Sequence, residues 1–193
     1  MKKDDATQED ESERIIFLTD VDENPITTAI SQLFNLAAKD TGSKKPITII
    51  INTFGGSVYD MFALYDAMKY VQSFKIPVDT VGVGKIMSAG VLLLAAGTCR
   101  KVGKNASIMY HLTANSVDGN IFDIECELAE TKRLEALCND LLAENSKMTV
   151  KNIEDLLKSK TDVYMSADRA IELGIADKKL SSFKSRKRKK VGT

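Results

Sequence analysis

The chain has 193 residues, 44% of them hydrophobic and 28% charged, as in ordinary globular proteins. Its 27 basic and 27 acidic side chains cancel, which excludes binding to nucleic acid or anionic lipid through net charge. The three cysteines, Cys99, Cys126 and Cys138, form no C-x-x-C pair, so they predict reduced thiols in the cytoplasm rather than a metal site or a disulfide framework.

Charged segments flank one predicted domain. Residues 1–14 are polar and contain no apolar stretch of a secretory signal, so we expect a flexible arm there. The domain is predicted over residues 15–180. Residues 181–193 contain KSRKRKK, which predicts a solvated basic tail rather than a nucleic-acid contact. The longest apolar run, residues 91–96, is too short to cross a bilayer, so no membrane partner is expected.

Strands and helices alternate from the start of the domain. RIIFLTD predicts a short strand. The segment ENPITTAISQLFNLAAKDTG predicts a helix capped by Asn24, with Pro25 in the first helical position. PITIIIN is β-branched and apolar on both faces, which is typical of a strand buried between helices. A second helix is predicted to begin after Ser57.

The same alternation continues with the strand PVDTVGVG, the short buried helix SAGVLLLAAG and the strand NASIMYH. This order predicts an α/β fold with parallel, right-handed crossovers. A long helix is predicted over residues 121–144, and its periodicity fits either a projecting helix or one that covers the core. TVKNIEDLLKSK and a helix capped by Ser166 and ended by Gly174 complete the domain.

Ser88 and His111 are the candidate catalytic pair. Ser88 lies between a glycine-rich strand end and a short helix, an arrangement akin to a nucleophile elbow, beside N–H groups suited to an oxyanion. His111 is the single histidine and would have to be the base for a serine nucleophile. Taken alone, however, such a serine is more often a helix cap, and such a histidine is more often structural.

Gly55 and Gly56 form a second turn, after the strand that precedes the second helix. They allow the backbone to approach a ligand closely, although a tight strand-to-helix turn would need the same glycines. Because neighbouring parallel strands end at one edge of a sheet, the two turns predict a shared site. Seven aspartates follow His111, and their spacing does not identify which one would orient the imidazole.

Five ordered blocks resemble the proteolytic subunit of the Clp protease family (ClpP): RIIFLT, IIINTFGGSVYDMFALYDAM, GVGKIMSAGVLLLAAGT, SIMYH and TDVYMSADRAIELGIAD. The resemblance covers residues 14–180. It implies an α/β superhelix of repeated βαβ units, of the type shared by ClpP and crotonases, with a projecting long helix between His111 and the catalytic acid.

The resemblance implies a serine endopeptidase. It assigns Ser88 as nucleophile, His111 as general base and Asp162 as the acid that orients the imidazole. It places the backbone N–H groups of Gly56 and Ala89 in an oxyanion hole.

The resemblance also implies how substrates and partners bind. Extended polypeptide substrates would pair with residues 55–58 and 112–115, so Gly55, Leu112 and Thr113 are the predicted substrate contacts. Two stacked heptameric rings would enclose the sites, and an ATP-dependent unfoldase would supply unfolded chains. We therefore expect a cytoplasmic homo-oligomer with no cofactor, metal ion or nucleic-acid partner.

Several residues depart from the family pattern. The usual Asn-Ser-Pro-Gly-Gly is NTFGG here, and Leu112 and Thr113 stand where Gln-Pro is common. These departures suggest a specialised or virus-encoded member, such as a head-maturation protease.

Three different functions are also compatible with parts of the sequence. A crotonase-like acyl-CoA enzyme would share the fold, but it would commonly need glutamates that IMSAGVLLL and NTFGGSV lack. A catalytically silent ring subunit would act as a scaffold, although all three residue types of a triad are present. A Ser–Lys dyad would use Lys85, three residues before Ser88, as the base.

Overall fold

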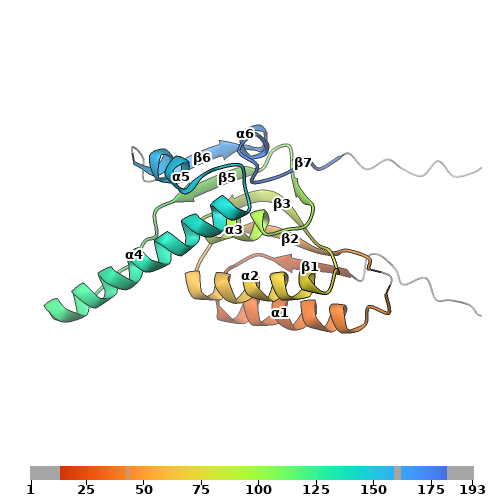
Figure 1. Ribbon diagram of the computed structural model, residues 1–193, viewed down its shortest axis with the longest axis horizontal. Helices are drawn as coiled ribbons and strands as arrows, with labels where there is room; N and C mark the ends of the chain where they lie inside the picture. Colours follow the sequence, from red (N-terminus) through yellow and green to blue (C-terminus); the bar gives the residue numbers. More distant parts are fainter. Residues whose placement is uncertain (1–13, 43, 159–161, 182–193) are drawn as a thin grey trace, which may run out of the picture.

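The computed structural model describes residues 14–42, 44–158 and 162–181 (Figure 1). The predicted arm, except Arg14, and the predicted tail, except Ser181, lie outside the described residues. Arg14 is buried, and its guanidinium donates hydrogen bonds to Asp40 at 3.1 Å and to the Lys45 carbonyl at 3.0 Å. Arg14, which the sequence analysis assigned to the arm, therefore packs against the domain.

A mostly parallel sheet forms the centre of the fold. Its strands are β1 (Ile15–Leu18), β2 (Ile47–Thr53), β3 (Val78–Met87), β4 (Arg100–Val102), β5 (Ser107–His111), β6 (Asp162–Ser166) and β7 (Lys178–Lys179). The order is β1-β2-β3-β4-β7 with parallel pairing, and β5 pairs in parallel with the later part of β3. The predicted α/β class is confirmed. The antiparallel pairing of β6 with β5 was not predicted.

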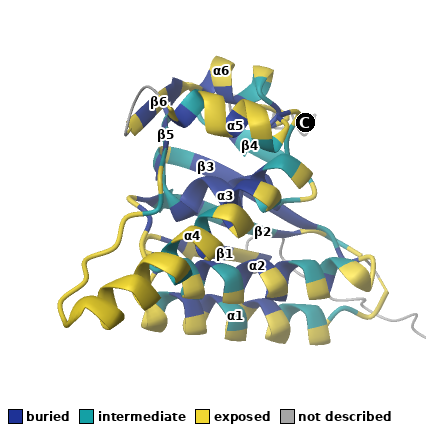
Figure 2. Cartoon of the chain, turned by 60° about the vertical axis from the view of Figure 1, so that its left-hand side comes forward, coloured by how far each residue is buried: buried dark blue, intermediate teal, exposed yellow. Residues whose placement is uncertain are grey.

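Six helices lie between these strands in the described part of the chain: α1 (Glu23–Ala38), α2 (Val58–Ser73), α3 (Ala89–Ala95), α4 (Ile121–Glu144), α5 (Val150–Leu157) and α6 (Ala167–Glu172). In Figures 1 and 2, α1 and α2 lie side by side below the sheet, while α5 and α6 lie above it beside β6. The seven residues of α3 are all buried, so this short helix runs through the core.

The core is built from side chains that alternate along the strands. Every second residue of β2, from Ile47 to Thr53, is buried, and Ile49 and Ile51 are almost inaccessible. The corresponding stripe of α2 buries Met61, Leu64 and Met68 against the sheet. In Figure 2, β2 is largely dark blue and lies above α1 and α2, whose outer faces carry exposed, yellow segments.

Two sequence predictions differ from the observed elements. The first helix begins at Glu23 with Asp22 as its N-cap, so Pro25 takes the third helical position and Asn24 is not the cap. A helix tolerates this because its first N–H groups have no intrahelical acceptor in any case. The short strand β4 was missed because two of its three residues, Arg100 and Lys101, are basic.

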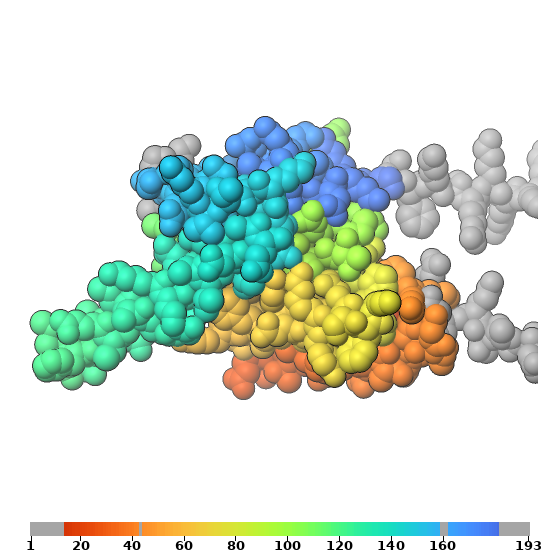
Figure 3. Space-filling model, viewed as in Figure 1, coloured from red at the N-terminus to blue at the C-terminus, as the bar shows by residue number. Residues whose placement is uncertain are grey.

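Helix α4 both projects and covers the core. Its first half extends away from the body of the molecule, as Figure 3 shows, and Ile121 and Phe122 are 66% and 73% exposed. Its second half buries Leu134, Cys138 and Leu142. The two interpretations that periodicity left open each describe one half of this helix. None of the described helices has the length and apolar character needed to span a membrane.

Candidate active site

Ser88 occupies a sharp turn between β3 and α3. Its φ and ψ angles of 52° and −124° lie in a region that non-glycine residues rarely adopt. Its N–H donates to the Met109 carbonyl of β5 at 2.8 Å, which fixes the turn to the sheet. Although Ser88 is the N-cap residue of α3, its side chain makes no capping hydrogen bond. The hydroxyl is therefore presented to the surroundings, as in a nucleophile elbow.

Two glycines let this turn pack closely. A Cβ on Gly55 would lie 2.6 Å from Ser88 Cβ, and one on Gly90 would lie 2.7 Å from Thr53 Cγ2. Gly55 also has a φ of 106°, which disfavours every other residue. The predicted meeting of the two glycine turns at one edge of the sheet is confirmed, since β2 and β3 are neighbours.

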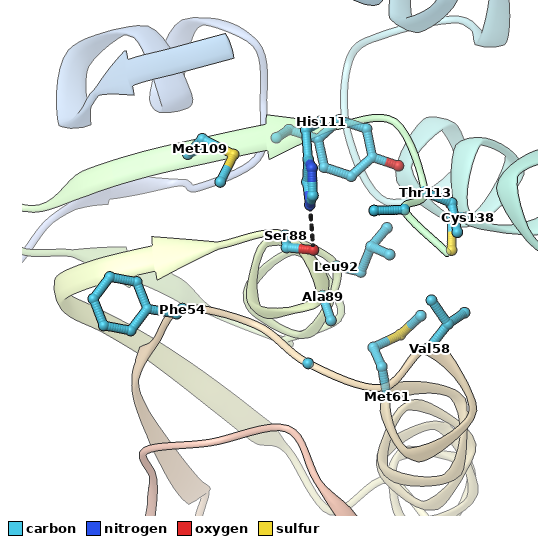
Figure 4. Close-up of a pocket in the computed structure, with 13 residues that line it drawn as sticks. Phe54, Val58, Met61, Ser88, Ala89, Leu92, Met109, His111, Thr113 and Cys138 are labelled. Atoms are coloured by element: carbon cyan, nitrogen blue, oxygen red, sulfur yellow. Dashed lines mark hydrogen bonds between the residues drawn. The ribbon is translucent and has the colours of Figure 1, made fainter. Parts of the chain in front are cut away.

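His111 lies directly beside Ser88. A hydrogen bond of 2.8 Å joins His111 Nε2 to Ser88 Oγ, drawn as the dashed line in Figure 4. The β5–β6 register places Asp162 opposite His111, and Asp162 Oδ1 lies 3.8 Å from His111 Nδ1. This distance is too long for a hydrogen bond but leaves the carboxylate facing the ring nitrogen. Asp162 is thus the aspartate, among the seven candidates, that the fold brings to the histidine.

A cleft of about 300 Å³ opens over this pair (Figure 4). We call it the Ser88 cleft. Its lining residues are Phe54, Gly56, Val58, Met61, Ser88, Ala89, Leu92, Met109, Tyr110, His111, Thr113, Ala114 and Cys138.

The Clp protease family model matches residues 2–182, which include all the residues of this cleft. The chain belongs to the Clp protease family. The resemblance drawn from the sequence blocks is thereby confirmed, and the chain is a peptidase of the ClpP type. Members of the Clp protease family generally form oligomeric rings that work with unfoldases.

The residues predicted to bind the oxyanion or the substrate of this Clp protease do not all line the Ser88 cleft. Gly56, Ala89 and Thr113 line the Ser88 cleft. Ala89 begins α3, so its N–H has no intrahelical acceptor. Gly55 lies against Ser88, and Leu112, which is 41% exposed, does not line the cleft.

An apolar pocket at one end of the cleft was not predicted from the sequence. Val58, Met61, Leu92 and Cys138 contribute to it (Figure 4). Burial, followed by the charge of Glu135, raises the pKa of the Cys138 thiol to about 12. The thiol is therefore protonated near neutral pH and serves as an apolar wall rather than a nucleophile. No sequence signal distinguished Cys138 from other residues of the long helix.

A smaller groove of about 240 Å³ continues from this end of the cleft toward α4. It shares Gly56, Val58, Thr113 and Ala114 with the Ser88 cleft. Its far wall includes Glu130, whose pKa is lowered to about 2 by hydrogen bonds from Arg133 and Tyr59. The two hollows together form an extended path beside both predicted peptide-binding segments.

Lys85 is not placed as the base of a Ser–Lys dyad. Its Nζ lies 4.4 Å from the centroid of the Phe54 ring, and the hydrogen bond to Ser88 comes from His111. Within residues 14–42, 44–158 and 162–181, no group of three or more His, Cys, Asp or Glu side chains is placed to hold a metal ion.

Substituting Gly55 by Ala is expected to lower peptidase activity by at least about a hundredfold, because the added Cβ would displace Ser88 from His111. The strained backbone and the clash should also cost about 1–3 kcal/mol of the free energy of unfolding. Steady-state hydrolysis of a fluorogenic peptide and thermal melting measure the two effects.

Gly42→Ala is the matched control for this substitution. Gly42 has a similar φ of 98°, but a Cβ there would meet nothing within 4 Å. It should lose about 1–2 kcal/mol of stability and keep its activity within about twofold. Equal activity losses in both variants would show that the contact with Ser88 is unimportant.

Proposed function

We propose that this chain is a serine endopeptidase in which Ser88, His111 and Asp162 act as a catalytic triad. The 2.8 Å hydrogen bond between Ser88 Oγ and His111 Nε2 carries the proposal. The strained turn at Ser88 supports it, because such backbone strain is commonly retained at functional sites.

The proposed reaction begins when His111 Nε2 takes the proton of the Ser88 hydroxyl as Oγ attacks the scissile carbonyl carbon. The carbonyl oxygen becomes an oxyanion, which the N–H groups of Gly56 and Ala89 stabilise. The imidazolium then gives its proton to the departing amine, and the C–N bond breaks. Water, deprotonated by the same imidazole, hydrolyses the resulting acyl-enzyme.

Asp162 has a supporting role in this scheme. Its carboxylate faces Nδ1 at 3.8 Å, a position from which it favours the Nδ1–H tautomer and stabilises the imidazolium. The Asp162 side chain is 48% exposed and has room to rotate, and a small rotation would bring its carboxylate within hydrogen-bond distance of Nδ1.

The substrates we propose are extended, unfolded polypeptides. An extended chain would lie along residues 55–58 and 112–115 and place one side chain in the apolar pocket. Main-chain pairing accepts many sequences, which suits broad proteolysis. We further propose stacked heptameric rings, joined through the projecting half of α4, with a cytoplasmic unfoldase as partner.

Covalent labelling tests the nucleophile. A fluorophosphonate should modify one residue of the full chain, Ser88, and peptide mass spectrometry would locate the adduct. His111→Ala should label at least about a hundredfold more slowly, because the hydroxyl loses its base. A crotonase-like enzyme has no activated serine and would not label.

Ser73→Ala is the serine control, since Ser73 is an exposed residue at the end of α2. It should label at the rate of the unmodified protein. Labelling that persists in Ser88→Ala, or an adduct at another serine, would contradict the proposed function.

A further inference from the structure

Phe54 lines the end of the Ser88 cleft that faces away from the apolar pocket, and Lys85 lies beside its ring. In Figure 4, Phe54 lies on one side of Ser88, while Val58, Met61 and Cys138 lie on the other. Met109 lines the cleft on the Phe54 side. The proposed triad mechanism gives no role to this end of the cleft.

The position of Phe54 is fixed by contacts on both sides of it in the chain. Thr53 is fully buried, and its Oγ1 accepts a hydrogen bond of 3.0 Å from the N–H of Gly55. Gly55 in turn packs against Ser88. The backbone of Phe54 is therefore held at a fixed place relative to Ser88.

Lys85 comes from the neighbouring strand and holds the ring. Its Nζ lies 4.4 Å from the Phe54 ring centroid, within the range of a cation–π contact. The Lys85 N–H donates to the Asn52 side-chain Oδ1 at 3.2 Å, so the ends of β2 and β3 are also joined by this hydrogen bond. The ring remains 71% exposed despite this contact. A fixed and exposed aromatic ring beside a nucleophile is a surface that a ligand in the cleft would cover.

The direction of the substrate follows from the rest of the cleft. The apolar pocket lies on the side of Ser88 opposite Phe54, and the groove toward α4 shares Val58 and Thr113 with it, so we assign the acyl part of a substrate to that side. An extended peptide that passes Ser88 from that side continues toward Phe54. The residues that reach Phe54 are therefore those on the leaving-group side of the scissile bond.

We propose that Phe54 is a specificity-determining residue that binds an apolar side chain in the first position after the scissile bond. This inference rests on the proposed endopeptidase function. The ring supplies the apolar contact, and Lys85 restricts the ring's motion, which lowers the entropy lost when substrate binds.

The test uses internally quenched peptides that differ only in the residue after the scissile bond, which is Phe, Gly or Glu, with cleavage positions checked by mass spectrometry. The unmodified protein should have a higher kcat/KM for the Phe peptide than for the Gly peptide. Phe54→Ala should reduce this ratio about tenfold, equal to about 1.4 kcal/mol. Phe54→Leu, which keeps an apolar side chain, should retain most of the preference.

Phe74→Ala is the matched control, because Phe74 is 58% exposed and lies outside the cleft. It should keep the ratio of the unmodified protein. An unchanged ratio in Phe54→Ala overturns the inference. So does a preference for Glu that is lost in Lys85→Met and kept in Phe54→Ala, since Lys85 would then be the binding group. Failure of the unmodified protein to cleave any peptide or to label at Ser88 would instead refute the endopeptidase function, and the inference with it.

Discussion

Ser88→Ala is expected to lower peptide hydrolysis by about 10⁴-fold or more, because it removes the atom that would form the acyl-enzyme. Residual turnover would come from substrate binding and from the N–H groups that stabilise an oxyanion. The measurement is kcat/KM for a fluorogenic peptide, with thermal melting and sedimentation as checks that fold and assembly are retained.

Ser88→Ala should change the stability of the fold only slightly. Alanine fits the same turn, and the change removes one hydrogen bond, to His111, whose loss typically costs about 0.5–1.5 kcal/mol. A large loss of activity with a near-normal melting temperature would therefore show that the catalytic step is impaired and the fold is not. Activity within about tenfold of the unmodified protein would contradict the assignment of Ser88 as nucleophile.

His111→Ala is expected to have an effect of similar size, at least about 10⁴-fold on kcat/KM, because the proposed nucleophile and base would act as a unit. The double variant Ser88→Ala/His111→Ala should be little worse than either single variant. Losses that multiply in the double variant would show that the two residues act separately.

Two further measurements address His111 directly. Added imidazole should restore part of the activity of His111→Ala, since the cleft would hold a free base near Ser88. His111 is the single histidine of the chain, so a histidine-selective acylating reagent reports on it alone in protein without an affinity tag. Full activity after its acylation would exclude a catalytic imidazole.

The helices were the most predictable part of the fold. The bounds of α4 agree with the prediction, because Asn120 and Asp123 form a capping box at its start. Strand β4 and the antiparallel β5–β6 pair were not predictable, since both depend on contacts between residues distant in the chain. The start of α1 was misplaced because Asn24 and Asp22 are equally suitable caps by residue type.

The candidate site was predictable to different degrees. Side-chain chemistry and the scarcity of histidine made Ser88 and His111 candidates, although taken alone each residue was more often a cap or a structural residue. Asp162 required the family resemblance, because its position beside His111 depends on the register between β5 and β6. Cys138 and the apolar pocket were missed because they depend on where the buried half of α4 crosses the cleft.

The β5–β6 register also limits how this protein can change over evolution. Successive side chains of a strand point to opposite faces, so a shift of one residue would turn Asp162 away from the imidazole. The alternation of buried Ile108 and Tyr110 in β5 would be inverted by the same shift. Point substitutions on the exposed positions of β6 leave this alignment intact. Insertions or deletions of a single residue within either strand do not, and lineages of this enzyme should therefore tolerate changes of side chain here far better than changes of length.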